Sequence, residues 1–409
     1  MKRFLTPLLL FTGVFLAVQL LLSSTLIYQE QEGLFLWSGD YFTQMFRTSF
    51  PLSGIVGDYL TQFFRFRYIG PLIVALEVVL AYLLIKGILS RFRLGWDILS
   101  AFLACAVWVA VAFAPTAKTG VLILLLLFPV FLLTRFLRKK ETRPLKPWVE
   151  WGGTAVLLVG TGIFLSCHST IASRERTAAL RLAVIHSDWD GVLSIATPEV
   201  SREDRSMLPF AMMALGMKGQ LGDRIFDYDI RYEADFDMRE SNDPYTNYFF
   251  KGFLYNQLLC PNESEHDFFQ LSTLQPHGQS FLVLRQLVAV NYVMGNFPLV
   301  RKYLAILSRS SCHDRFVRYY EELMSGNTPR EDSSLDFRKQ VVFINQDPYT
   351  NLLTLDASGF RSRFLIDRML CTLILRGEMM QFYRVFETVR EEYYPVIPKY
   401  YRQALFMQH

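Results

Sequence analysis

The stretch RFLRKKETRPLKP, Arg135–Pro147, decides how the chain is organised. It sets one acid against six basic side chains, which are Arg135, Arg138, Lys139, Lys140, Arg143 and Lys146. Apolar runs flank the stretch on both sides, and a charged, mixed-composition half follows the second run. Because Lys and Arg concentrate in cytoplasmic loops, the side of a membrane on which this stretch lies determines the side of that second half.

Five apolar runs precede residue 169, and each is long enough to cross the ~30 Å hydrocarbon core of a bilayer. We expect membrane spans at residues 4–27, 69–89, 97–114, 119–137 and 149–168. The first run is longer than a signal-peptide core and has no A-x-A cleavage pattern, so we expect it to stay in the chain. Residues 1–168 are therefore predicted to form a transmembrane domain.

The distribution of basic residues predicts the orientation of these spans. With the N-terminus inside, the inner segments carry the six residues above together with Lys2, Arg3, Lys86, Arg91 and Arg93. The outer flanks carry fewer over longer loops, namely Arg47, Arg65, Arg67, Lys118, Arg174, Arg176 and Arg181. Five spans then place the N-terminus in the cytoplasm and residues 169–409 outside, which is the periplasm if the membrane is a bacterial inner membrane.

The first outer loop, residues 28–68, is rich in aromatic residues separated by single charges. Such amphipathic segments are typical of helices that lie in the membrane interface. The loop is expected either to anchor the chain over the bundle or to border a site for a lipid-linked substrate. Candidate catalytic acids are Glu30, Asp40 and Asp58 in this loop and Glu77 within the second span. Glu77 is expected to be either a protonated structural residue or a functional one.

Residues 169–409 show helical periodicity without strand-like alternation, which predicts an all-α fold. Four segments share a pattern in which a small residue ends one helix and an apolar residue follows two positions later. The small residues are Ser187, Gly219, Gly295 and Gly377, and the apolar residues are Trp189, Leu221, Phe297 and Met379. This pattern resembles the turn inside a tetratricopeptide repeat and favours an α-solenoid of helix pairs over a plain bundle.

The chain carries no signature of the common catalytic, cofactor or metal sites. No P-loop, nucleophile elbow, Rossmann fingerprint or HExxH pattern is present. The acids of residues 227–245 lack the glycine and terminal Glu of an EF-hand loop. We therefore expect no cofactor and no metal, and the small net charge of +4 does not suggest nucleic-acid binding. No CxxC pair occurs, and a bridge between Cys260 and Cys312 remains open.

As a whole, the chain resembles an uncharacterised family of Bacteroidota inner-membrane proteins that join a multi-span half to a tetratricopeptide-like tail. The residues that carry this resemblance are Ser38-Gly39-Asp40-Tyr41-Phe42, Asp58-Tyr59-Leu60-Thr61-Gln62-Phe63-Phe64 and Gly70-Pro71. The resemblance implies the membrane topology and no activity. It also implies more spans than the five found here.

Two functions fit these observations. The first is a membrane-anchored extracytoplasmic scaffold or assembly factor that binds protein partners of the cell envelope through its helical-repeat tail. The alternative is a membrane glycosyltransferase or ligase that uses a polyprenyl-linked donor and the acids of the first outer loop. Such enzymes use about twice as many spans, so the scaffold is the favoured hypothesis and the enzyme stays the alternative.

Overall fold

The computed structural model describes residues 4–92, 97–137, 146–238, 243–275, 279–326, 347–359 and 361–407. These residues form helices, and no β-strand occurs among them, which confirms the all-α fold class. The chain divides into two compact units. Unit 1 comprises Met1–Ala179 and Ile306–Arg315, and unit 2 comprises Leu180–Ala305 and Phe316–His409. The sequence placed the boundary between residues 168 and 169, whereas unit 1 extends eleven residues further and includes a distant segment.

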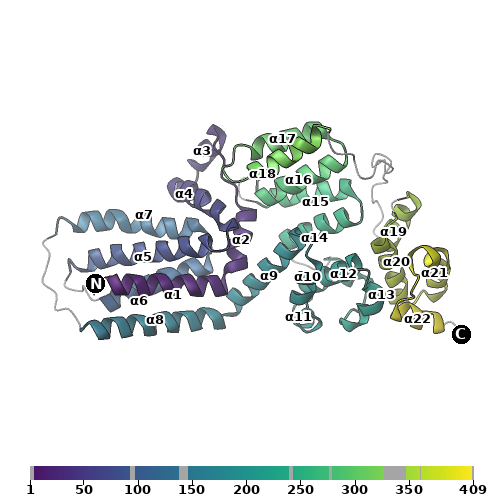
Figure 1. Cartoon of the computed structure of the whole chain (residues 1–409), viewed down its shortest axis with the longest axis horizontal. Coiled ribbons are helices and arrows are strands. Elements are labelled where there is room, and N and C mark those ends of the chain that lie inside the picture. The colour runs from purple at the N-terminus through teal and green to yellow at the C-terminus, as the bar shows by residue number, and fades with distance from the viewer. Residues whose placement is uncertain are drawn as a thin grey trace. The chain divides into compact units, whose positions relative to one another are not determined.

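Unit 1 is built around five long helices that run side by side (Figure 1). They are α1 (Leu5–Leu21), α5 (Ile69–Leu89), α6 (Asp97–Phe113), α7 (Ala117–Thr134) and α8 (Pro147–Cys167). Shorter elements complete the unit, namely α2 (Ser23–Glu32), α3 (Gly39–Met45), α4 (Pro51–Thr61), the 3-10 helix η2 (Gln62–Arg65) and the first part of α9 (Ser169–Ile185).

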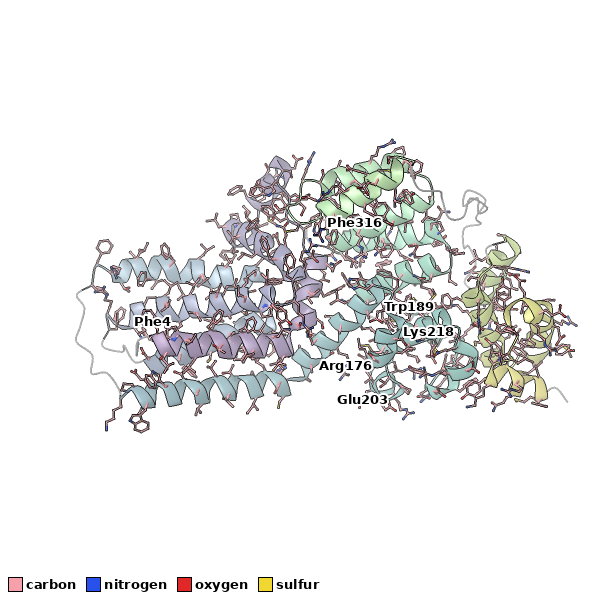
Figure 2. All side chains as sticks on the ribbon, viewed as in Figure 1. Phe4, Arg176, Trp189, Glu203, Lys218 and Phe316 are labelled. Atoms are coloured by element: carbon pink, nitrogen blue, oxygen red, sulfur yellow. The ribbon has the colours of Figure 1, made fainter. Side chains whose placement is uncertain are left out.

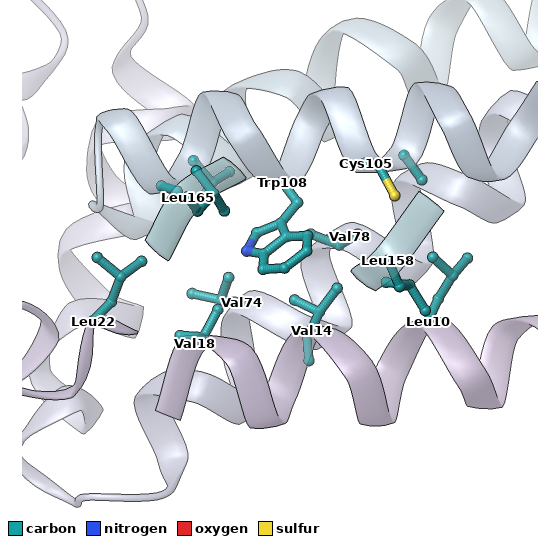
Figure 3. Close-up of a cluster of buried hydrophobic side chains, with 14 of the residues drawn as sticks. Leu10, Val14, Val18, Leu22, Val74, Val78, Cys105, Trp108, Leu158 and Leu165 are labelled. Atoms are coloured by element: carbon teal, nitrogen blue, oxygen red, sulfur yellow. The ribbon is translucent and has the colours of Figure 1, made fainter. Parts of the chain in front are cut away.

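The core of this bundle is apolar and centres on Trp108 of α6, which is 1% exposed. Val14 and Val18 of α1 and Val74 and Val78 of α5 surround the indole (Figure 3). Each pair is spaced four residues apart, so both members lie on one face of their helix. This spacing buries one stripe of each helix and leaves the opposite stripe apolar and exposed.

Three helices, α5, α7 and α8, are long and apolar enough to cross a membrane. The pair α1 and α2 adds a fourth if its two helices count as one span, although they meet at an angle of 75°. Helix α6 has 17 residues and is shorter than each of these three helices. Five clear spans were expected, and the described residues contain three or four.

The span expected over residues 4–27 is not one continuous helix, because α1 ends at Leu21 and α2 begins at Ser23. The carboxylate of Glu175 on α9 accepts hydrogen bonds from the amides of Ser24 (2.7 Å) and Thr25 (2.8 Å). These amides belong to the first turn of α2, where no intrahelical acceptor exists. An acid at that position satisfies the free donors and the positive end of the helix dipole, so it stabilises the break.

The segment Ile306–Arg315 packs against the outer loop within unit 1. The amide of Trp37 donates to the carbonyl of Arg309 (2.8 Å), and its indole NH donates to Ser311 Oγ (2.7 Å). Ser310 Oγ donates to Gln62 Oε1 (3.1 Å), and the Arg65 guanidinium donates to the carbonyl of Cys312. These contacts explain why the segment belongs to unit 1.

Unit 2 consists of short helices. Its elements are α10 (Trp189–Ile195), α11 (Pro198–Glu203), η3 (Arg205–Met207), α12 (Leu208–Met217), α13 (Leu221–Arg224), η4 (Ile225–Asp227), η5 (Glu233–Phe236), α14 (Pro244–Gln257), α15 (Pro261–Thr273), α16 (Phe281–Val293), α17 (Phe297–Leu307), α18 (Asp314–Met324), α19 (Pro348–Ala357), α20 (Arg363–Arg376), α21 (Met379–Tyr393) and α22 (Lys399–Phe406). The ends of α17 and α18 reach into the segment assigned to unit 1. Trp189 at the start of α10 and Lys218 just after α12 are labelled in Figure 2.

Candidate functional site

The four small residues singled out in the sequence all adopt left-handed backbone conformations. Their φ angles are 54° at Ser187, 62° at Gly219, 74° at Gly295 and 73° at Gly377. Each makes the paired hydrogen bonds of a Schellman motif. At Gly377, for example, its amide donates to Ile374 O (3.1 Å) and the amide of Glu378 donates to Leu373 O (2.9 Å).

The residue two positions after each turn is the first residue of the next helix. Trp189, Leu221, Phe297 and Met379 begin α10, α13, α17 and α21, respectively. In the best example of the pattern, the ring of Phe297 lies 6.1 Å from that of Tyr292 on the preceding helix. The pattern therefore marks four tight connections between consecutive helices.

A fifth turn of the same kind occurs at Leu259, which the sequence pattern did not identify. Its φ angle is 58°, its amide donates to Asn256 O (3.3 Å), and the amide of Cys260 donates to Tyr255 O (2.8 Å). This turn joins α14 to α15 and divides the long interval between Gly219 and Gly295. Leucine rarely adopts a positive φ, so no sequence rule would have placed a turn there.

A cavity of about 380 Å³ opens in unit 2. Its wall is formed by α14, α16 and α18, with the end of α9 alongside. The lining residues are Ile185, Ser187, Phe253, Asn256, Gln257, Phe281, Arg285, Gln286, Ala289, Phe316, Tyr319 and Tyr320. On α14, α16 and α18 they recur at spacings of three and four, so each helix contributes one face. Phe316 on α18 is labelled in Figure 2.

The cavity combines an aromatic wall with polar groups. The rings of Phe281 and Phe316 are 5.9 Å apart, and those of Phe316 and Tyr320 are 4.9 Å apart. Burial, with a contribution from Tyr319, raises the pKa of Tyr320 to about 12, although Arg285 acts in the opposite direction. The phenol is therefore protonated near neutral pH and can donate a hydrogen bond. No sequence motif marks this site, because its residues are spread over more than 130 positions, from Ile185 to Tyr320.

The outer-loop acids have different environments. Asp58 is 6% exposed; it accepts a hydrogen bond from Tyr41 Oη (2.9 Å) and pairs with Lys118 Nζ (2.8 Å). Burial and the neighbouring carboxylate raise the pKa of Tyr41 above its ordinary value, so the phenol stays protonated and donates to Asp58. Asp40 is exposed in the first turn of α3. Asp58 is thus engaged in holding α3, α4 and α7 together.

Glu30 lies in a second buried group with His313 from the segment Ile306–Arg315. Glu30 is 3% exposed and accepts a hydrogen bond from Gln31 Nε2 (2.5 Å). His313 Nε2 is 3.9 Å from Glu30 Oε1. Burial, together with Arg65, lowers the pKa of His313 to about 4, so its ring is neutral at pH 7. Glu30 is therefore packed inside unit 1 and is not displayed to an external substrate.

Glu77 lies in α5 and is 4% exposed. Within the described residues, neither of its carboxyl oxygens has a hydrogen-bond partner. The carboxyl group packs directly on α7, where it occupies the space that a Cβ atom at Gly120 would need. A charged carboxylate without partners would be costly in such a place, which favours the protonated form.

The remaining predicted residues and clusters are placed as follows. Of the basic stretch, Arg135 lies just after α7 and Lys146 just before α8, whereas Arg138, Lys139, Lys140 and Arg143 lie outside the described residues. The five cysteines, Cys105, Cys167, Cys260, Cys312 and Cys371, are all free, so the bridge considered between Cys260 and Cys312 is absent.

Acids of residues 227–245 form ion pairs with arginine, including Asp235 with Arg205 and Asp237 with Arg368 (2.6 Å each). No group of three or more His, Cys, Asp or Glu side chains among the described residues could hold a metal ion.

Comparison with known proteins places the chain in one family. No curated protein and no solved structure matches the chain. The family described as "Family of unknown function (DUF6057)" matches residues 1–171 and 111–409, two overlapping segments that together cover the whole chain. The chain therefore belongs to the DUF6057 family, whose function is unknown.

Proposed function

We propose that the protein is a membrane-anchored scaffold that binds a protein partner in the cavity of unit 2. The observation that carries this proposal is a cavity to which α14, α16 and α18 each contribute one face. Stacked helix pairs bury their faces against their neighbours and leave a continuous inner surface, which is suited to peptide and protein ligands. A binding role requires only this surface and no catalytic group.

Unit 1 supplies the membrane anchor in this proposal. Helices α7 and α8 expose large apolar side chains along their length, among them Leu126 (57%), Leu133 (68%), Val156 (72%) and Ile163 (58%). Contiguous apolar surface of this kind is unusual on a protein surrounded by water. With the basic stretch on the cytoplasmic side, the N-terminus is cytoplasmic and unit 2 is periplasmic, in the inner membrane of a bacterium.

The outer-loop acids give little support to a glycosyltransferase. Asp58 and Glu30 are buried and engaged with Tyr41, Lys118 and Gln31, so neither carboxylate is available to a substrate. A general base or a metal ligand has to reach the reacting group. Of these three acids, only Asp40 is exposed.

Photocrosslinking from the rim of the cavity tests the scaffold proposal. Tyr319 lines the cavity and is 56% exposed, whereas Tyr232 does not line it and is 68% exposed. We would replace each in turn with benzoylphenylalanine in the full-length chain, irradiate living cells and identify adducts by mass spectrometry.

We expect a discrete protein adduct from position 319 that is absent from position 232. Because both positions are exposed tyrosines, accidental collisions would give similar adducts at both. Failure to obtain an adduct at position 319, or the same adducts at both positions, would contradict the proposal.

A further inference from the structure

The polar side chains of the cavity have the chemistry that recognises a peptide backbone. Asn256 and Gln257 on α14 and Gln286 on α16 line the cavity. None of the three makes a side-chain hydrogen bond to another described residue. A carboxamide offers a donor and an acceptor together, as a peptide group does. Three amides at one surface can therefore pair with consecutive peptide groups of an extended chain.

The aromatic wall lies beside these amides and provides room for an apolar side chain. Phe281 and Phe316 meet edge to face with an interplanar angle of 83°. Tyr319 and Tyr320 lie next to them, with ring centroids 5.3 Å apart and an interplanar angle of 90°. A ring or a branched aliphatic group placed among such rings gains contact area and favourable edge-to-face geometry.

Arg285 is the one formally charged residue among the described residues that line the cavity. A guanidinium group at a partly buried site binds a carboxylate through two parallel hydrogen bonds. Arg285 stands on α16, which comes between α14 and α18 in the chain, and the amides of α14 and the tyrosines of α18 line the same cavity. A ligand that uses all three helices therefore presents its carboxylate from the middle of the bound segment rather than from its end.

We infer that the cavity binds an extended internal segment of a partner protein in which an Asp or Glu side chain is followed or preceded by an aromatic or branched apolar residue. This inference rests on the proposed scaffold function and specifies the ligand of the same site. The carboxylate pairs with Arg285, the backbone pairs with Asn256, Gln257 and Gln286, and the apolar side chain packs against Phe316 and its neighbouring rings.

A peptide library on the purified full-length chain in detergent micelles tests the inference. The probe is a set of random twelve-residue peptides, prepared once with free C-termini and once with amidated C-termini. We expect enrichment of peptides with an internal acid next to an aromatic or branched residue, at equal strength in both sets.

Charge removal at Arg285 provides the matched comparison. Arg285→Gln should weaken binding of the enriched peptides by about 10- to 100-fold, because a hydrogen bond between charged groups is lost. Asn256→Ala should weaken it several-fold. Arg301→Gln removes the same charge from an exposed position of α17 outside the cavity and should leave binding unchanged. Thermal unfolding of each variant shows whether the fold is retained.

Three outcomes would overturn the inference. These are the absence of any enriched peptide, equal binding by the wild type and a folded Arg285→Gln variant, and loss of binding upon amidation, which would identify a chain terminus as the ligand. The result is also separable from the scaffold proposal. A protein adduct at position 319 without peptide selectivity would leave the scaffold in place and remove this ligand.

Discussion

At the scale of single residues, long-range contacts decide features that local sequence does not reveal. Glu175 is 150 residues from Thr25, yet its carboxylate binds the first turn of α2 and fixes the end of α1. Arg174, its neighbour, donates to the carbonyl of Phe113 at the end of α6 (2.7 Å). One residue thus satisfies a helix N-terminus and the other a helix C-terminus, as the helix dipole favours. The sequence shows two charged residues after a span and nothing of their partners.

The buried imidazole of His313 makes the segment Ile306–Arg315 sensitive to acid. Its pKa is about 4 in the folded chain because of burial and Arg65, compared with about 6.5 for a solvated ring. Between these two values the opened segment takes up a proton that the folded segment does not. The stability of the segment is therefore independent of this group above pH 6.5 and is lost as the pH falls towards 4. Over this range the equilibrium constant for opening rises by about tenfold for each pH unit of acidification.

Labelling of Cys312 measures this opening, because the thiol is only partly exposed and adjoins His313. We expect the labelling rate of the wild type to rise from pH 6.5 to pH 4 relative to His313→Gln, with a disulfide reagent that remains reactive at acidic pH. The ratio of the two rates cancels the intrinsic pH dependence of the thiol. The exposed His186 provides the control, since His186→Gln should leave the wild-type behaviour unchanged. A constant ratio over the whole range would refute a neutral buried imidazole.

At the scale of elements, the four positions that the sequence pattern singled out lie at helix connections, because the chemistry of such turns is local. Glycine adopts a positive φ without steric cost, so a glycine before a new apolar run is informative on its own. The turn at Leu259 has the same geometry without that chemistry, and it could not be found. The cavity also lay beyond prediction, because it depends on how α14, α16 and α18 are placed and not on a motif.

The connections can be tested by a reciprocal pair of substitutions. A Cβ atom at Gly377 would meet no other atom within 4 Å, so Gly377→Ala changes only the backbone preference. We expect it to lower the free energy of unfolding of unit 2 by about 1 kcal/mol. Ser187 already has a positive φ and is exposed, so Ser187→Gly should raise that free energy by a similar amount.

Urea unfolding of the full-length chain in micelles measures both changes, followed by fluorescence of Trp189 in a background in which the other five tryptophans are replaced by phenylalanine. The two variants should shift the midpoint in opposite directions. Shifts in the same direction, or none, would show that these positions do not hold left-handed turns in solution.

At the scale of the whole molecule, the number of crossings decides the compartment in which unit 2 works. Four crossings would return the chain to the side on which it began, and five would take it across. Helix α6 is the deciding element, because its 17 residues rise about 25 Å, near the lower limit for a span. It packs against α5 and α8 in the bundle, and the proposed topology has it cross with them.

Reporter fusions resolve this question along the chain. On the proposed topology, alkaline phosphatase joined after Arg91 or Lys146 should be inactive, and the same enzyme joined after Thr116 or at the C-terminus should be active, because this reporter folds only outside the cytoplasm. A cytoplasmic fluorescent reporter at the same four sites should give the inverse pattern. Since α6 separates Arg91 from Thr116, equal activity at these two sites would show that α6 does not cross. The number of crossings would then depend on whether the bent pair α1–α2 forms a span. An inactive C-terminal fusion would place unit 2 in the cytoplasm, and its partner would have to be sought there.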